Sequence, residues 1–220
     1  ESLVEEPVVK QVEPDGLQRL FAPYIPPRAV PGISAPWPDI VITSGRQSAA
    51  YARMIGKKSR GRTFTAVMQD PKAPPSWFDF LWVNTHDKAS GPNVMKTLTA
   101  PHRITAERLQ TEGAALRKRL AELPSPHIAL ILGGPNSAYP FSINDAKSIG
   151  EQVAKLAQTR QASVLVTPSR RTGSDRLSAV IEGLGNTPHW AWDQNDHNPY
   201  FGILELSDEI VVTSDSVNMM

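Results

Sequence analysis

One stretch near the middle of the sequence constrains the fold most, because an unbroken apolar run meets two glycines there. Residues 128–132 read Ile-Ala-Leu-Ile-Leu, Gly133 and Gly134 follow directly, and a helical pattern begins near Asn144. Such a run predicts a buried strand of a parallel sheet that leads through a small-residue loop toward a helix. The loop and the helix start together offer unpaired N–H groups that can bind an anion. A tight turn without any ligand is the alternative interpretation.

The glycine pair matches neither of two common phosphate-binding motifs. It lacks the third glycine of the dinucleotide motif G-x-G-x-x-G, and no Gly-Lys-Ser/Thr follows it as in a P-loop. An anion site here would therefore depend on neighbouring loops as well as on the glycines.

Strands and helices alternate through most of the chain. Strands are predicted in the first half at residues 39–45, 62–69 and 78–83, and in the second half at residues 127–132, 163–167, 189–192 and 209–213. Apolar residues at helical spacing follow several of these strands. Because this alternation builds parallel sheets with right-handed crossovers, we predict an α/β protein with two Rossmann-like domains.

The domain boundary is predicted at a pair of prolines. Pro124 and Pro126 end a helix that begins near Thr105, which favours an N-terminal domain of residues 1–123 and a C-terminal domain of residues 124–220. Residues 1–38 are dense in proline beyond one short apolar run, so we expect either a surface loop or a segment that wraps around the domain.

Composition excludes several classes of function. The chain has 23 Lys and Arg against 22 Asp and Glu, so no strong electrostatic field favours the binding of nucleic acid. The absence of cysteine rules out thiolate chemistry. No apolar run reaches the length of a membrane span, and no signal peptide opens the sequence. The chain starts and stops in mid-pattern, so we expect both ends to be truncated relative to the whole protein.

Polar and small residues follow the strands of the second half. Ligands of open parallel sheets bind outside the carboxyl ends of the strands, so these residues should share one edge. The residues predicted to bind a diphosphate or nucleotide are Gly133, Gly134, Asn136, Ser137, Ser169, Arg170, Arg171, Thr172, Tyr200, Ser214, Asp215 and Ser216. Backbone N–H groups, hydroxyls and the forked arginine donors all suit phosphate. The alternative is that Ser and Thr only cap helices while the arginines are solvated.

Acid–base groups are few in the first half. His86, Asp87 and His102 are the catalytic candidates, although a loop histidine is more often a surface hydrogen-bonding residue. Residues 189–197 contain two histidines and four acidic or amide residues, but in an extended segment His189 and Asp193 lie too far apart to share one ion. We therefore predict no metal site.

Eight short motifs then identify a family. In order along the chain they are residues 37–46 (WPDIVITSGR), 68–71 (MQDP), 86–94 (HDKASGPNV), 100–105 (APHRIT), 133–135 (GGP), 169–172 (SRRT), 198–200 (NPY) and 212–217 (VTSDSV). Together they resemble the mitochondrial-fission Elm-type family, which comprises the plant "elongated mitochondria" protein and many bacterial relatives. The resemblance covers nearly the whole chain from Trp37.

The resemblance implies a GT-B glycosyltransferase-like fold, in which two Rossmann-like domains flank a cleft. A UDP- or GDP-type nucleotide-sugar would then be held by the second domain, with no further cofactor. Ser44, Gly45, Arg46 and Arg103 would lie on the acceptor side with His86, Asp87 and His102. A non-catalytic adaptor that uses a vestigial glycosyltransferase fold is the alternative.

The resemblance also concerns the location of the protein in the cell and another function that has been assigned to its relatives. It favours a bacterial member in the cytoplasm, with peripheral contact to the inner membrane left open. Bacterial relatives have been called nucleoside-diphosphate-sugar epimerases, but this sequence lacks the G-x-x-G-x-x-G opening and the Tyr-x-x-x-Lys pair of short-chain epimerases. The sequence leaves the donor base, the acceptor, the stereochemical course and the oligomeric state undetermined.

Overall fold

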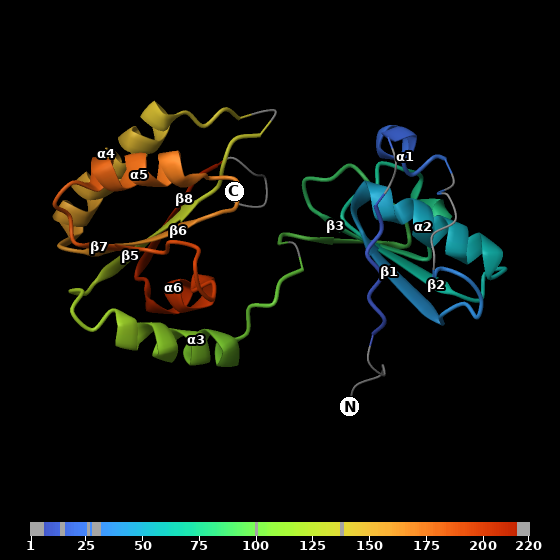
Figure 1. The fold of residues 1–220 in the computed structure, drawn as a ribbon. Helices are drawn as coiled ribbons and strands as arrows, with labels where there is room; N and C mark the ends of the chain where they lie inside the picture. Colours follow the sequence, from blue (N-terminus) through green and yellow to red (C-terminus); the bar gives the residue numbers. More distant parts are fainter. Residues whose placement is uncertain are drawn as a thin grey trace. The chain divides into compact units, whose positions relative to one another are not determined.

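A computed structural model describes residues 7–13, 16–25, 27, 32–99, 101–136 and 139–214. These residues form two compact units, Glu1–Pro101 and His102–Met220, each built on its own sheet. Both sheets have four strands, and every pairing between neighbouring strands is parallel. This architecture confirms the predicted α/β class with two Rossmann-like domains (Figure 1).

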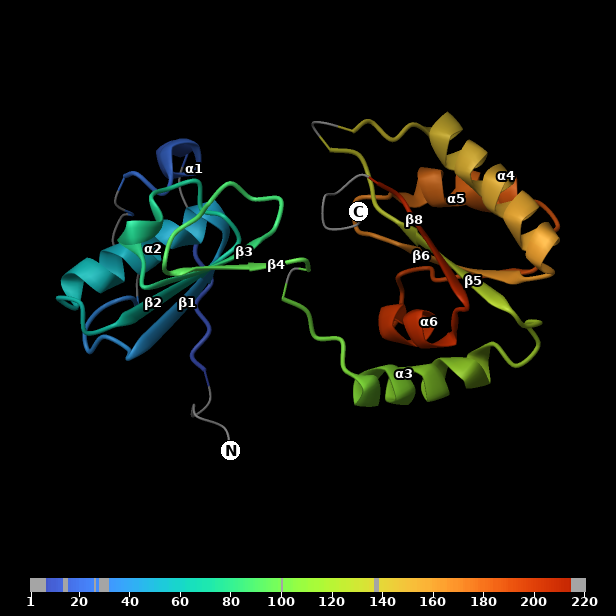
Figure 2. The ribbon, with the colours of Figure 1, turned by 180° about the vertical axis from the view of Figure 1, so that it is seen from behind.

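The first unit contains sheet A, whose strands follow one another in space as they do in the chain. Its elements are α1 (Gly16–Phe21), β1 (Ile40–Ser44), α2 (Gly45–Lys58), β2 (Phe64–Met68), the 3-10 turn η1 (Pro75–Trp77), β3 (Phe80–Asn84) and β4 (Val94–Thr97). Ala49 and Ala52 of α2 pack on Val67, Leu81 and Val83 in the core of this unit. The helices α1 and α2 lie on the same side of the sheet (Figures 1 and 2).

The strand β1 differs from its prediction in burial. The apolar run Ile40-Val41-Ile42 indicated a buried strand, but Ile40 is 53% and Ile42 is 61% exposed. By the alternation of β1 they lie on the face opposite Val41, which packs in the core beneath α2. In the described part of the chain, no helix covers that face (Figures 1 and 2).

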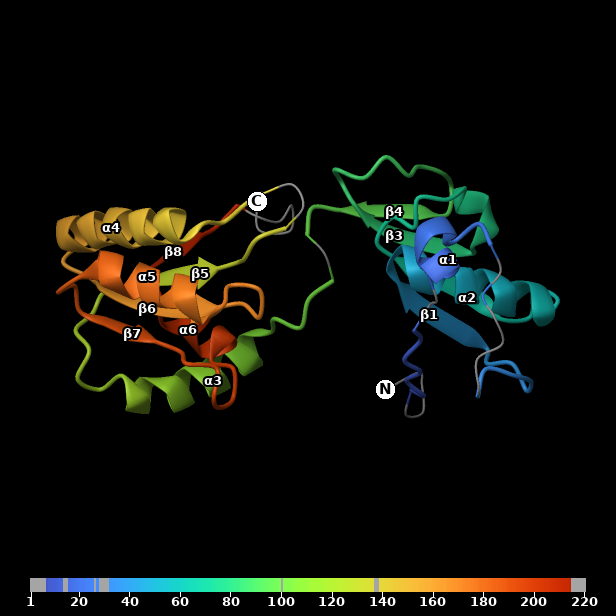
Figure 3. The same cartoon turned by 45° about the horizontal axis from the view of Figure 1, so that its top comes forward.

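The second unit contains sheet B, with strand order β7-β6-β5-β8. Its elements are α3 (Ala106–Arg119), β5 (His127–Leu132), α4 (Ile143–Arg160), β6 (Ser163–Pro168), α5 (Ser174–Leu184), β7 (His189–Ala191), α6 (Tyr200–Leu206) and β8 (Glu209–Val212). The helices α4 and α5 cover one face, and α3 and α6 cover the other (Figure 3). Leu130 is fully buried on the α4 side, and Ala129 and Leu165 are fully buried on the α3 side.

The boundary between the units lies before α3 and not after it. We predicted the boundary at Pro124, but Leu116 and Leu120 at the end of α3 pack on Ile203 of α6. A Cβ on Gly202 would lie 2.8 Å from the carbonyl oxygen of Glu112, which shows how closely the two helices approach. The helix α3 is therefore part of the second unit.

Three other elements were not predicted. The helix α1 lies within the expected proline-rich loop, the short strand β4 completes sheet A, and α6 begins at Tyr200, directly after Asn198-Pro199. No helix in the described part of the chain is both long enough and apolar enough to cross a membrane.

Candidate functional site

The strand order of sheet B defines one point where its winding reverses. The chain steps from β5 to β6 to β7 in one direction and then returns to place β8 on the other side of β5. Open α/β sheets bind ligands outside the carboxyl ends of the strands at such a reversal. In this unit that position lies between the end of β5 and the end of β8, where residues 133–136 and 213–214 follow the strands.

The glycine pair after β5 is held by its neighbours. The N–H of Gly133 donates a 2.7 Å hydrogen bond to Oγ1 of Thr213, beyond the end of β8. A Cβ on Gly134 would lie 2.4 Å from the carbonyl carbon of Arg171, so only glycine fits between the loops. The two glycines therefore allow close packing of loops, and the N–H of Gly133 is already engaged.

The start of α4 is closed by its own side chains. Ser142 and Asp145 form a capping box, in which the Asp145 carboxylate accepts a 2.9 Å hydrogen bond from the N–H of Ser142. The Ser142 hydroxyl and, after it, this backbone bond hold the pKa of Asp145 below its usual value, so the carboxylate stays charged. An acidic group at this position competes with an anionic ligand. An anion site was expected at the start of the helix that follows the glycine pair. The Asp145 carboxylate takes that place in the structure.

The loop after β6 leads to a helix start without such a cap. Gly173 precedes α5 with a φ of 77° and makes no side-chain capping bond. Arg170 and Arg171 are exposed in this loop. The first turn of α5 also contains one acidic side chain, Asp175, but unlike Asp145 in α4 it forms no capping box. Of the predicted phosphate-binding groups, these arginines and the start of α5 are the best placed to meet an anion.

Thr172 has a structural role in the same loop. Its side chain is fully buried, and its hydroxyl donates to the carbonyl oxygen of Gly133. The N–H of Ser169 in turn donates to Oγ1 of Thr172 over 2.9 Å. Thr172 therefore ties the end of β6 to the end of β5, and it is not available to contact a ligand directly.

The other predicted residues of this edge differ in their surroundings. Asn136 closes its own loop, because its Oδ1 accepts a 2.9 Å hydrogen bond from the N–H of Tyr139. Ser214 is exposed just beyond β8, and Tyr200 forms the first residue of α6 with its ring centroid 5.5 Å from that of Phe201. Ser137, Asp215 and Ser216 lie outside the described residues.

The loop after β7 is fixed to α3. Nε1 of Trp192 donates to Asp196 over 2.8 Å, and Arg119 reaches the same carboxylate over 2.7 Å. His197 lies 3.1 Å from a carboxylate oxygen of Glu112. This histidine thus pairs with the Glu112 carboxylate of α3 and not with Asp193 of its own loop.

The carboxyl edge of sheet A carries a network that only partly matches the prediction. Nζ of Lys72 lies 2.8 Å from Asp70 and 3.4 Å from Asp87. The side chains of these aspartates are only 6% and 14% exposed, whereas His86, 4.0 Å from Asp87, is 45% exposed. The structure therefore brings two predicted residues, His86 and Asp87, together with two that sequence reasoning missed, Asp70 and Lys72. Their signal was the polar run after β2, where Asp70 belongs to the motif of residues 68–71 but no chemical role was predicted for it.

Backbone strain marks the same network. Gln69 and Lys72 adopt positive φ angles of 67° and 57°, which non-glycine residues rarely do. The Asp70 carboxylate stabilises this turn by accepting the N–H of Lys72 over 2.8 Å, and its hydrogen bond to Nζ raises the pKa of Lys72. Strained residues of this kind cluster at functional sites more often than elsewhere.

The predicted acceptor-side residues are spread over both units. Ser44 and Gly45 form the junction between β1 and α2, and Arg46 donates from its Nη2 to the carbonyl oxygen of Arg19 over 2.8 Å. His102 and Arg103 belong to the second unit, where Nδ1 of His102 accepts a 3.2 Å hydrogen bond from the N–H of Ile104. Within the first unit, the network around Asp87 therefore forms without His102.

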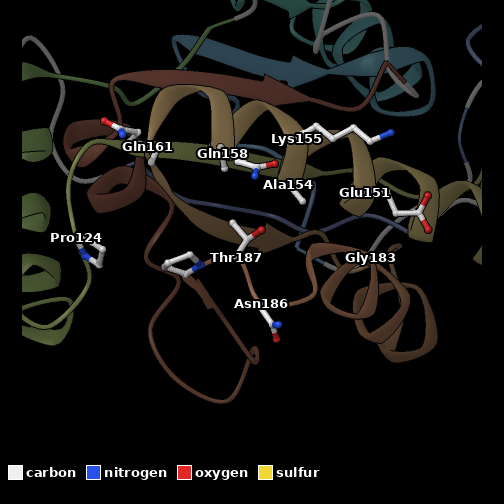
Figure 4. A pocket seen from close by; sticks show the side chains of 12 residues that line it. Pro124, Glu151, Ala154, Lys155, Gln158, Gln161, Gly183, Asn186 and Thr187 are labelled. Carbon is white, nitrogen blue, oxygen red and sulfur yellow. The ribbon is translucent and has the colours of Figure 1, made fainter.

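Two grooves of the second unit lie away from these loops. One, of about 680 Å³, is lined by side chains of α4, such as Gln158, and by Asn186 and Thr187 before β7 (Figure 4). The other, of about 670 Å³, is lined by His127 at the start of β5 and by Asp208 just before β8. Because their lining residues precede the strands, both grooves open at the amino edge of sheet B, opposite the predicted site.

Comparison with known proteins places these observations in context. The family model described as Mitochondrial fission ELM1 matches residues 2–220. A protein of Arabidopsis thaliana named "Mitochondrial fission protein ELM1" is 26% identical over 207 residues, which cover 83% of this chain and 48% of that protein. An uncharacterized protein of Rickettsia prowazekii, RP120, is 24% identical over 216 residues, which cover 83% of this chain and 60% of that protein. No solved structure matches significantly.

Proposed function

Because this chain belongs to the mitochondrial fission ELM1 family, we propose that it binds a nucleotide-sugar of UDP or GDP type, as a GT-B-type glycosyltransferase does. The chain spans about half the length of the Arabidopsis relative that it matches, so the proposal concerns the whole protein of which these residues form a part. The diphosphate would lie at the carboxyl edge of sheet B.

One observation carries the proposal. Exposed Arg170 and Arg171 and the start of α5 follow β6, the strand next to β5, at the carboxyl edge of sheet B. A forked cation beside free helix N–H groups suits a diphosphate. Gly134 lets the loop after β5 pack directly against the backbone of Arg171.

The first unit would supply the acceptor side. Asp87 and His86 are the candidates for removing a proton from an acceptor hydroxyl, and Lys72 would hold the Asp87 carboxylate in place. His102, which was also predicted as catalytic, stays a candidate from the second unit together with Arg103.

A thermal-shift titration of the full-length protein tests the proposal. A UDP- or GDP-sugar at about 100 times its Kd should stabilise the fold by about 2.7 kcal/mol. Arg170→Ala should remove most of this stabilisation. Lys118→Ala changes an exposed cation in the last turn of α3 and should leave the response intact. Failure of every nucleotide-sugar to stabilise the wild-type protein would contradict the proposal.

A non-catalytic adaptor is the second candidate, and a different observation favours it. The N–H of Gly133 and the hydroxyl of Thr172 form hydrogen bonds within the protein, so these two groups of the predicted phosphate site are not available to a ligand. The Arabidopsis relative is itself named for mitochondrial fission and not for sugar transfer. An adaptor should retain partner capture from its own lysate when Arg170 is replaced by Ala, whereas loss of capture in that variant would argue against this role.

A further inference from the structure

The turn that connects α2 to β2 carries a cluster of cations. Lys57 and Lys58 end α2, and Arg60 and Arg62 follow it directly. All four residues are exposed, and we call this set the basic turn. It lies at the amino edge of sheet A, where β1 and β2 begin, because α2 starts at the carboxyl end of β1 and runs back along the sheet (Figure 1).

This part of the chain differs in charge from the rest. The whole chain has 23 Lys and Arg against 22 Asp and Glu, a net charge of +1. Between Asp39 and Asp70, however, six Lys and Arg residues occur without a single acidic residue. Positive charge is therefore concentrated in one segment, and four of its six cations belong to the basic turn. Such a concentration produces a local positive potential that attracts anions.

Nearby carboxylates do not neutralise the basic turn. Within the described part of the chain, none of its four cations forms an ion pair. Asp79, in the loop before β3, instead accepts 2.7 Å hydrogen bonds from both the N–H and the hydroxyl of Thr65. Exposed arginines of the second unit do have partners, since Arg119 lies 2.7 Å from Asp196. The charge of the basic turn is thus available to an external anion.

The fold itself does not require this concentration of charge. Cations in the last turn of a helix complement its dipole, which explains Lys57 and Lys58. Arg60 and Arg62 lie beyond the helix, where Nε of Arg62 donates to the carbonyl oxygen of Ser59 over 3.1 Å. Arg60 has a positive φ of 57°, a conformation that glycine or asparagine adopts more readily. The geometry of the turn therefore does not explain an arginine at position 60.

The chemistry of the basic turn favours one kind of anionic partner. Residues 57–62 contain no aromatic ring and no Asn or Gln, the side chains that stack on bases or read their edges. They also contain no apolar side chain that would fill a pocket on a protein partner. An anionic bilayer requires neither, because its lipids diffuse laterally and gather around a small group of cations. Clusters of about four to eight Lys and Arg are typical of proteins that bind such bilayers.

We propose that the basic turn binds the surface of a bilayer that contains anionic phospholipids. Its four cations contact the charged headgroups, so the binding is reversible and weakens as the salt concentration rises. The network around Asp87 lies at the carboxyl edge of sheet A, opposite the basic turn, and this contact leaves it uncovered. The proposal does not depend on the binding of a nucleotide-sugar by the second unit.

Co-sedimentation of the full-length protein with lipid vesicles tests the proposal. One set of vesicles contains about 30 mol% phosphatidylserine in phosphatidylcholine, and the other set contains phosphatidylcholine alone. The test variant combines Lys57→Gln with Lys58→Gln. Its matched control combines Arg117→Gln with Lys118→Gln, which also removes two exposed cations from the last turn of a helix, α3. A variant of the other two cations, Arg60→Gln with Arg62→Gln, is the second test should the first fail to fold.

The wild-type protein should bind only the vesicles that contain phosphatidylserine at about 0.1 M salt, and about 1 M salt should release it. Each cation near an anionic bilayer strengthens binding about fivefold, so the test variant should lower the partition coefficient about 25-fold. The control variant should lower it less than about threefold, because its cations lie outside the contact.

Three results would overturn the proposal. Equal binding to both kinds of vesicle would show that anionic lipid is not recognised. An equal loss in the test and control variants would show that net charge alone matters. Binding to neither kind of vesicle would also contradict the proposal, and binding of a DNA duplex through the same four cations would then assign the basic turn to nucleic acid. The thermal shift with nucleotide-sugar should be the same in all variants, so failure of the proposed function is detected separately.

Discussion

The N–H of Gly133 and the hydroxyl of Thr213 join the ends of β5 and β8 through a 2.7 Å hydrogen bond. This bond spans the position at which the winding of sheet B reverses. It keeps the two loops together and determines which groups of this edge remain available to a ligand. The following predictions test this arrangement and the network in sheet A.

Thr213→Val should destabilise the protein by about 1–3 kcal/mol, because it leaves the buried N–H of Gly133 without a partner. Thr213→Ser retains the hydroxyl and should lose much less. Urea denaturation followed by circular dichroism measures both variants. A stable Thr213→Val variant beside a destabilised Thr213→Ser variant would show that the methyl group, and not the hydrogen bond, stabilises this edge.

Gly134→Ala should cost about 1–3 kcal/mol or more, because the added Cβ would lie 2.4 Å from the carbonyl carbon of Arg171 and the two loops would have to separate. Gly16→Ala is the control, since no atom lies within 4 Å of a Cβ built there. The same denaturation assay applies. A Gly134→Ala variant as stable as wild type would contradict the close approach of the loops.

Asp70→Ala should destabilise the first unit by about 1–3 kcal/mol, because the carboxylate accepts the N–H of Lys72 and supports its positive φ. Asp175→Ala, which changes an exposed carboxylate, should have little effect. Hydrogen exchange at residues 69–72 reports the local loss. Unchanged exchange in this turn would show that Asp70 does not hold it.

Stability should fall as the pH drops below about 6.5, in part through His127. Burial lowers the pKa of this histidine, with nearby Arg117 acting in the same direction and Asp208 opposing them. The unfolded chain then binds a proton more readily than the folded one, so the stability present above pH 6.5 is lost as the pH falls toward the folded-state pKa. The Nδ1 atom is buried without a hydrogen-bond partner, which adds to the cost of charging the ring.

The control for this prediction is His127→Gln. Urea midpoints of wild type and variant, measured at pH 7.5 and pH 5.5, should differ in their pH response, with a smaller drop in the variant. An identical drop in both proteins would assign the acid sensitivity to other groups.

Strands with strong apolar patterns could be predicted from the sequence, whereas short or atypical elements could not. The run before Gly133 gave β5, and the alternation ending at Met68 gave β2. The strand β4 contains only Val94–Thr97 and has no strong period, and α6 follows Asn198-Pro199, which is typical of a turn. In each case the packing partner, and not the local pattern, stabilises the element.

That the loops after the strands of sheet B share one edge was predictable from the sequence, but the contacts within these loops were not. The parallel strand pattern indicated that the loops at 133–136 and 169–172 share one edge, which the register of β5 and β6 confirms. That Thr172 is buried, or that Lys72 bridges Asp70 and Asp87, depends on how loops distant in sequence meet. Likewise, the boundary before α3 follows from its contact with α6, which no local signal reveals.

In the proposed function, Arg170 and the start of α5 would bind the diphosphate of a nucleotide-sugar. Isothermal titration of the full-length protein with UDP and GDP, compared with uridine and guanosine, tests it most directly. The account predicts that one diphosphate binds, that its parent nucleoside binds at least about 100-fold more weakly because it lacks the charge-assisted contacts, and that Arg170→Ala abolishes the difference. Binding of neither diphosphate, or equal binding of nucleoside and diphosphate, would contradict it.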